Sequence, residues 1–458
     1  MALVVLLPAV ALAGIGASTR PAAGEQLWAS PYDGPANRED GAAAIAVAPD
    51  GSAVFVTGRS AGSGRGDDYA TVAYDAATGA ELWVARYDRA GLDDDAVAIG
   101  VDPDGSKVFV TGSSSRSEAD SAYATIAYDA ASGAGLWTAR FDVPGYNDEP
   151  AALRVSPDGT KVFVTGTARV RGLFNFGDFE TVAYDAATGG QLWARSYGLL
   201  PAGVSRAVAL AVGPDGSEVF VTGDAEFEDF ATVSYDSETG TPLWTRRWDG
   251  PAHGRDYAEA LAVSPDGAKL FVTGLTPVLG RNQFQYGIVA YDTATGAELW
   301  SSFYDGPGSF DQPSAVGVSP DGSQVFVTGE SFSRIDKATD YATVAYDTTA
   351  GAQLWARRYN GPRQGWEIPH ALAVAPDSSQ VFVTGLSDGP RNELHCATVA
   401  YGSRSGGELW VMRFHEWGNT CRAFDLGVSP DGSTLYVTGE NDRAGGEFDY
   451  ATIAYSTR

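Results

Sequence analysis

The sequence predicts an all-β protein, an eight-bladed β-propeller built from four-stranded antiparallel blades. Three observations predict it. The string Pro-Asp-Gly (once Pro-Asp-Ser), followed by an apolar strand and Thr-Gly, occurs eight times. The string Ala-Thr-Val-Ala-Tyr, or a close variant of it, and the dipeptide Leu-Trp also occur eight times each. Four-stranded units repeated about four to eight times around an axis are typical of propellers.

The three strings recur in a constant order, once every 51–57 residues. The turn aspartates are Asp50, Asp104, Asp158, Asp215, Asp266, Asp321, Asp377 and Asp431. The repeat tryptophans are Trp28, Trp83, Trp137, Trp193, Trp244, Trp300, Trp355 and Trp410. Each repeat is therefore complete, and the number of repeats predicts the number of blades.

One repeat contains four strands. In the second repeat we expect them at residues 96–101, 107–111, 123–128 and 136–141, with a polar loop at 113–122. Val, Phe, Tyr, Thr and Trp in runs of this length favour strand over helix. In the Pro-Asp-Gly turn, Pro presets φ and Gly takes the position where a β-carbon would clash.

The two ends of the chain predict how the ring closes. The repeats begin with a lone fourth strand, at Leu27 and Trp28, and end at Tyr455 after a third strand. The N-terminal strand should therefore complete the last blade. This pairing would leave no long unpaired strand edge.

The first strands predict how blades pack. One position holds alanine in seven repeats and Asp425 in the eighth, and the next position holds Ile, Leu or Val. Because side chains alternate faces along a strand, each blade should pack a small face against the large face of a neighbour. Arg154 stands where other blades have Gly or Ala. Polar residues at such packed positions can be functional. The favoured explanation is that the repeat sequence has drifted and exposes these residues to a water-filled channel.

Composition excludes some functions. With 31 Lys and Arg against 58 Asp and Glu, the net charge is −27, which disfavours nucleic acid as a partner. Residues 2–17 are almost wholly apolar, and Ala11-Leu12-Ala13 has the form of a signal-peptidase site. We expect a signal peptide and short linker at 1–24, a propeller at 25–458, no transmembrane span, and a secreted or extracytoplasmic monomer. The alternative is an apolar tail, because no Lys or Arg precedes the apolar run.

The link between the third and fourth strands carries a family resemblance. Residues 73–83, Ala-Tyr-Asp-Ala-Ala-Thr-Gly-Ala-Glu-Leu-Trp, resemble the tryptophan-docking motif A-x-D-x-x-T-G-x-x-x-W of quinoprotein-like (PQQ-repeat) eight-bladed propellers. The motif also matches fully at 183–193 and 290–300, and partially in four other repeats. The resemblance implies that the Trp and Gly are structural and join neighbouring blades. Some family members are dehydrogenases that depend on PQQ and calcium, and others are non-catalytic scaffolds, such as the lipoprotein that helps to assemble outer-membrane barrels.

This chain departs from the enzymes of the family. The alcohol dehydrogenases carry a disulfide between adjacent cysteines over the cofactor, whereas Cys396 and Cys421 are not adjacent and the blades lack large insertions. No P-loop, H-E-x-x-H or C-x-x-C motif is present. Three functions remain open: an exported non-catalytic binding or scaffold protein, which is favoured, a PQQ- and Ca²⁺-dependent oxidoreductase, and a propeller-type hydrolase or lyase.

Three groups of residues are candidate sites. The long connections should gather on one face, where a protein, peptide or carbohydrate could bind. Around blades seven and eight the predicted ligand-binding residues are Trp366, His370, His395, His415, Glu416 and Trp417; alternatively, the indoles fill gaps between blades. Carboxylates at the starts of first strands could bind Ca²⁺, or each could cap a turn; these are Asp40, Asp94, Asp148, Asp256, Asp311 and Glu367. Cys396 and Cys421 should form a disulfide if the protein is exported, unless their Cα atoms are too far apart.

Overall fold

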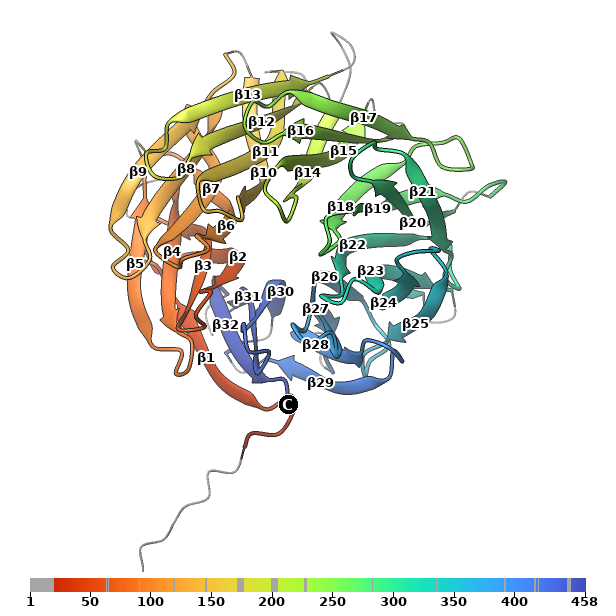
Figure 1. Cartoon of the computed structure of the whole chain (residues 1–458). Helices are drawn as coiled ribbons and strands as arrows, with labels where there is room; N and C mark the ends of the chain where they lie inside the picture. The colour runs from red at the N-terminus through yellow and green to blue at the C-terminus, as the bar shows by residue number, and fades with distance from the viewer. Residues whose placement is uncertain are drawn as a thin grey trace, which may run out of the picture.

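The computed structural model describes residues 20–458 except 63, 65, 90, 118, 119, 145, 171–176, 199–204, 226–228, 282, 335, 336, 391, 392, 416, 419 and 443–445. The described residues form eight four-stranded sheets arranged in a ring (Figure 1). The prediction of an all-β, eight-bladed propeller is confirmed. The predicted signal peptide falls almost entirely outside the described residues. In the part of the chain that the structure describes, no helix has the length and apolar character needed to cross a membrane.

The blades follow one another along the chain. Blade one contains β2 (Asp40–Val47), β3 (Ala53–Ala61), β4 (Asp67–Asp75) and β5 (Glu81–Tyr87). Blade two contains β6 (Asp94–Val101), β7 (Lys107–Ser117), β8 (Asp120–Asp129) and β9 (Gly135–Phe141). Blade three contains β10 (Tyr146–Val155), β11 (Lys161–Val170), β12 (Gly177–Asp185) and β13 (Gln191–Tyr197). Blade four contains β14 (Ser205–Val212), β15 (Glu218–Ala225), β16 (Asp229–Asp236) and β17 (Pro242–Trp248).

The second half of the ring repeats this order. Blade five contains β18 (Tyr257–Val263), β19 (Lys269–Pro277), β20 (Phe284–Asp292) and β21 (Glu298–Tyr304). Blade six contains β22 (Asp311–Val318), β23 (Gln324–Ser333), β24 (Ala338–Asp347) and β25 (Gln353–Tyr359). Blade seven contains β26 (Glu367–Val374), β27 (Gln380–Asp388), β28 (Leu394–Gly402) and β29 (Glu408–Phe414). Blade eight contains β30 (Cys421–Val428), β31 (Thr434–Asp442), β32 (Phe448–Ser456) and the N-terminal β1 (Gln26–Tyr32).

The ring closes as predicted, because β1 pairs antiparallel with β32. The two ends of the chain also rebuild the link that is continuous in the other blades. The Gly24 amide donates to the Ser456 carbonyl at 2.7 Å, and the Ser456 amide donates to the Glu25 carbonyl at 2.8 Å. These bonds correspond to those from Gly79 to Asp75 and from Asp75 to Ala80 within blade one. The seam therefore has the same hydrogen-bonded form as a covalently continuous blade.

The hairpins between second and third strands are longer than the sequence predicted. In blade two the expected loop at 113–122 is mostly strand, since β7 runs to Ser117 and β8 begins at Asp120. Ser115 pairs with Ser121 in the ladder. Backbone hydrogen bonds extend the ladder whatever the polarity of the side chains. The strand end predicted from the polar side chains therefore came too early.

The core lies between blades. Seven repeat indoles donate from Nε1 to a carbonyl of the next blade, as Trp83 does to Ala130 at 2.9 Å. The indole ring covers a left-handed glycine in that blade, for example Gly133 under Trp83. Near the axis, a β-carbon on Gly100 would lie 2.9 Å from Leu153 of the following blade, so the small face packs against the large face as predicted. The structural role that the resemblance implied for the Trp and Gly is confirmed.

Candidate functional site

The six predicted carboxylates at the starts of first strands stand in separate blades. Several accept the amide of a residue five or six positions earlier: Gly34 to Asp40 at 2.5 Å, Arg89 to Asp94, Val143 to Asp148, Gly250 to Asp256 and Gly306 to Asp311, the last four at 2.7–2.9 Å. Burial raises the pKa of Asp40, Asp94, Asp256, Asp311 and Glu367, to about 6 for Asp94 and Asp256 and to about 8 for Glu367.

The structure does not bring these carboxylates together as one metal site. Among the described residues, two groups of three acidic residues have ligand atoms within 4.8 Å of one another: Asp33, Asp40 and Asp449, and Asp229, Asp249 and Asp256. Each group contains a single member of the predicted six. The hydrogen bonds of the five aspartates correspond to the turn-capping alternative, in which a carboxylate holds the entry loop of its own blade, whereas Glu367 accepts from the Ser387 hydroxyl at 3.3 Å.

In the sector of blades seven and eight, the structure places the two loop tryptophans differently. The indole of Trp417 packs edge-on against Phe414 at 4.9 Å, beside the core between these blades. Trp366, which precedes β26, is 51% exposed. Its backbone is held in place, because its amide donates to the Asp388 carboxylate and its carbonyl accepts the Asp388 amide, both at 3.1 Å. Trp366 thus presents an exposed indole on a hydrogen-bonded backbone, whereas Trp417 contributes to packing.

The histidines of this sector do not form one cluster. His370 lies on β26 and contacts the first strand of blade eight, where its Nδ1 is 2.7 Å from the Ala423 carbonyl and its ring packs on Phe424 at 5.3 Å. His395 and His415 stack with ring centroids 4.3 Å apart and planes at 8°. Nitrogen lone pairs lie in the ring plane, so two parallel imidazoles do not converge on one metal ion.

Burial, together with the neighbouring His415, lowers the pKa of His395. Glu416, also predicted for this site, lies outside the described residues.

A disulfide joins Cys396 to Cys421 in the structure, with Cα atoms 4.9 Å apart. Cys396 belongs to β28 and Cys421 begins β30, so the bond connects blade seven to blade eight. Both residues are buried in the core between these blades. The disulfide is therefore part of the packed interface between blades seven and eight.

The inner edge of every blade carries a β-bulge at the same position of the first strand. In blade one the register shifts between Ala42 and Ala44, which leaves Ala43 as the extra residue. The eight bulge residues are Ala43, Val97, Ala151, Val208, Glu259, Ser314, His370 and Phe424. Bulges bend a strand and redirect a side chain, and they are frequent beside functional sites.

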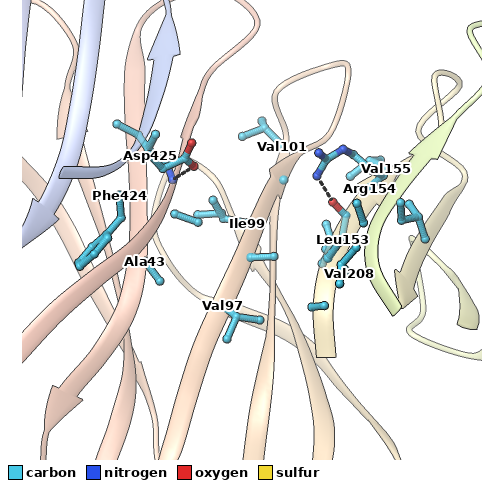
Figure 2. A pocket seen from close by; sticks show the side chains of 18 residues that line it. Ala43, Val97, Ile99, Val101, Leu153, Arg154, Val155, Val208, Phe424 and Asp425 are labelled. Atoms are coloured by element: carbon cyan, nitrogen blue, oxygen red, sulfur yellow. Dashed lines mark hydrogen bonds between the residues drawn. The ribbon is translucent and has the colours of Figure 1, made fainter. Parts of the chain in front are cut away.

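A cavity of about 620 Å³ lies against these first strands, from blade eight through blades one to four (Figure 2). Of the 18 residues that line it, Arg154 and Asp425 alone are charged. The Asp425 carboxylate accepts the Ile45 amide at 3.0 Å and the Leu426 amide at 2.8 Å. The Arg154 guanidinium donates from Nη1 to the Leu153 carbonyl at 2.7 Å.

Burial shifts the pKa of both charged side chains. Burial raises the pKa of Asp425 to about 6, against the opposing effect of its two amide bonds and of Arg154. Burial also lowers the pKa of the Arg154 guanidinium, against the attraction of Asp425. In the sequence both residues are exceptions to the repeat, for which drift was the favoured explanation. The signal that could have found this site is that the two exceptions carry opposite charges.

The residues that line this cavity do not fit PQQ. In the enzymes of the family the adjacent-cysteine disulfide covers the cofactor, whereas the disulfide here is buried between two blades. PQQ is a tricarboxylate, and the cavity offers it a single cation, Arg154, opposed by the carboxylate of Asp425.

Comparisons with known proteins agree with the fold. No curated protein sequence matches the chain. Sqt1 from Chaetomium thermophilum, solved bound to the N-terminus of a ribosomal protein, is similar in structure, with a TM-score of 0.61, 15% identity and coverage of 94% of this chain and 100% of that one.

Two quinohemoprotein alcohol dehydrogenases are also similar. The enzyme ADHIIG from Pseudomonas putida has a TM-score of 0.60 at 15% identity, and the enzyme from Comamonas testosteroni has a TM-score of 0.57 at 13%. Both comparisons cover 94% of this chain and 76% of the enzyme. At these identities the likeness is one of fold.

A family model gives the membership. The model described as outer membrane protein assembly factor BamB matches residues 14–174, 70–226 and 177–445. These matches span nearly all the blades described above. The chain therefore belongs to the BamB-like family of PQQ-repeat propellers.

Proposed function

We propose that this protein is an exported, non-catalytic propeller that binds a protein or peptide through the loop face at blades seven and eight. The observation that carries the proposal is Trp366, which is 51% exposed although both its amide and its carbonyl are hydrogen-bonded to Asp388. An exposed indole on a fixed backbone loses little conformational entropy on binding, and Trp is a frequent anchor in recognition.

The surroundings of Trp366 favour a peptide with basic and apolar residues. Asp388 fixes its backbone, Glu393 immediately precedes the neighbouring β28, and the whole chain carries a net charge of −27. Charge complementarity of this kind raises association rates and suppresses wrong partners. The loop is also held by Arg363, which donates to the Gly389 carbonyl at 3.4 Å.

The comparisons support a binding role. The matching family model describes an assembly factor for outer-membrane proteins, and the similar Sqt1 structure holds the N-terminus of a ribosomal protein. Export is supported by the apolar segment at residues 2–17 and by the disulfide, since disulfides persist in oxidising compartments.

Selection of a random phage-displayed peptide library on the full-length protein tests the proposal. Selected peptides should bind with Kd in the micromolar range or below, and Trp366→Ala should weaken them at least roughly tenfold, as expected for an aromatic anchor. Leu279→Ala is the matched control, because Leu279 is 68% exposed in a loop of blade five. Both variants should melt at the wild-type temperature.

Selected peptides that bind Trp366→Ala as well as wild type would contradict the proposed site. Dye reduction by the purified protein after addition of PQQ and Ca²⁺ would contradict the non-catalytic role. Binding to an array of glycans, with no enriched peptides, would assign the face to carbohydrate instead.

A further inference from the structure

We propose that the cavity against the first strands of blades eight to four is a separate binding site for a small zwitterion with an apolar middle. A short peptide with free termini is the class that fits it best. The proposal does not depend on the loop face, because Trp366 does not line this cavity.

The first step is that Arg154 occupies a position where the other blades have a small residue because neighbouring blades pack closely there. The other seven blades hold Ala46, Gly100, Ala211, Ala262, Gly317, Ala373 and Gly427 there. A β-carbon on Gly427 would lie 2.9 Å from Val47, and one on Gly317 would lie 2.7 Å from Leu372. A guanidinium cannot fit between the blades at this position, so the Arg154 side chain is exposed on the cavity wall instead.

The second step is that the Arg154 guanidinium keeps donors for a ligand. Its hydrogen bond to described residues runs from Nη1 to the Leu153 carbonyl. Arg presents a planar fork of five N–H donors that matches a carboxylate in two-point geometry. Most of this fork is therefore available to a ligand carboxylate that enters the cavity.

The third step is that Asp425 supplies the opposite charge from another blade. It replaces the alanine that the other seven first strands carry. Each of its oxygens accepts one amide, from Ile45 and from Leu426, and each keeps a lone pair for a further donor. Its pKa of about 6 leaves it ionised near neutral pH, when it can bind an ammonium group.

The fourth step is the wall between the two charges. Figure 2 shows Asp425 and Arg154 on different strands, with Ile99 and Val101 of blade two between them. A ligand with a single charge would leave the other charge unmatched inside a cavity whose remaining lining residues are uncharged. A molecule with an ammonium group at one end, a carboxylate at the other and an apolar body matches both charges and the wall.

A short peptide matches this description better than a free amino acid. The two charges of an α-amino acid are attached to the same carbon, whereas an extended peptide separates its termini by about 3.3–3.6 Å for each residue. The cavity volume of about 620 Å³ lies within the range of about 300–1,000 Å³ that is usual for small-molecule sites. The first strands are also edge strands of their sheets, so their free N–H and C=O groups can pair with a peptide backbone.

Calorimetric titration of the full-length protein with the tripeptide Ala-Leu-Ala tests the inference. Arg154→Gly and Asp425→Ala restore the residues of sister blades, so both variants should fold, as their melting temperatures will check. Each should weaken the tripeptide roughly 10- to 100-fold, the effect of losing a charged hydrogen bond. Trp366→Ala should bind the tripeptide as wild type does, which separates this site from the loop face.

The blocked peptides identify which end meets which charge. The N-acetylated tripeptide should bind weakly to wild type and lose little more in Asp425→Ala, and the C-amidated tripeptide should behave likewise with Arg154→Gly. No heat of binding at millimolar tripeptide, or equal affinity in wild type and both variants, would overturn the proposal. Free leucine binding as tightly as the tripeptide would overturn the assignment to a peptide.

Discussion

Substitution of Gly189 by alanine tests whether the indole-on-glycine contact holds neighbouring blades together. Gly189 has φ +72°, and a β-carbon there would lie 2.6 Å from Cδ2 and Cε3 of Trp137 in blade two. The indole cannot easily retreat, because its Nε1 donates to the Ala186 carbonyl at 3.1 Å and its ring packs on Phe109 at 5.8 Å. The added methyl group must therefore separate the two blades locally.

Gly280 provides a control with the same backbone conformation. Its φ is also +72°, but a β-carbon there meets nothing within 4 Å. At either position the left-handed backbone conformation costs alanine about 1–2 kcal/mol of free energy. In Gly189→Ala alone, overpacking against the indole adds a further cost of about 1–3 kcal/mol. We therefore expect a loss of about 2–5 kcal/mol in the free energy of unfolding for Gly189→Ala and about 1–2 kcal/mol for Gly280→Ala.

Urea unfolding at neutral pH, followed by tryptophan fluorescence, measures the difference between the two variants. The unfolding midpoint of Gly189→Ala should fall clearly below that of Gly280→Ala, with the slope of the transition unchanged. Equal midpoints would show that the glycine is required for its backbone conformation alone and that the indole contact adds nothing to the joining of blades.

Three further predictions concern the seam, the disulfide and a buried acid. Deletion of residues 25–34 removes β1 from blade eight and should lower the melting temperature and cause association through the exposed edge of β32; a monomer of native stability would refute the closure model. Thiol titration of the unfolded, unreduced protein should detect no free thiol from Cys396 or Cys421, and reduction should cost on the order of 3 kcal/mol; two titrating thiols would show that the bond does not form in solution. Because burial raises the pKa of Glu367 from 4.5 to about 8, the folded protein retains a proton that the unfolded chain loses, so stability should fall as pH rises through this window. Glu367→Gln should reduce that fall in urea midpoints between about pH 5 and pH 9, and an unchanged pH dependence would contradict the assignment.

Local patterns in the sequence determine most of the scaffold. The Pro-Asp-Gly turn, the third-strand string and the docking Trp each recur with the same neighbours, so one blade predicts the others. The offset of the termini likewise predicts that β1 completes blade eight, as the structure shows. These contacts are predictable from the sequence because each blade makes the same contacts with the same residues.

The tertiary structure alone decided what the exceptions do. Trp366 and Trp417 are both loop tryptophans in the sequence, yet one is exposed and the other packs on Phe414. Arg154 and Asp425 are 271 positions apart in the numbering, and the closed ring brings both to one cavity. The physical reason is that exposure and pairing depend on residues of neighbouring blades, which lie some fifty or more positions away along the chain. A residue that departs from the repeat has no equivalent in the other blades from which those neighbours could be predicted.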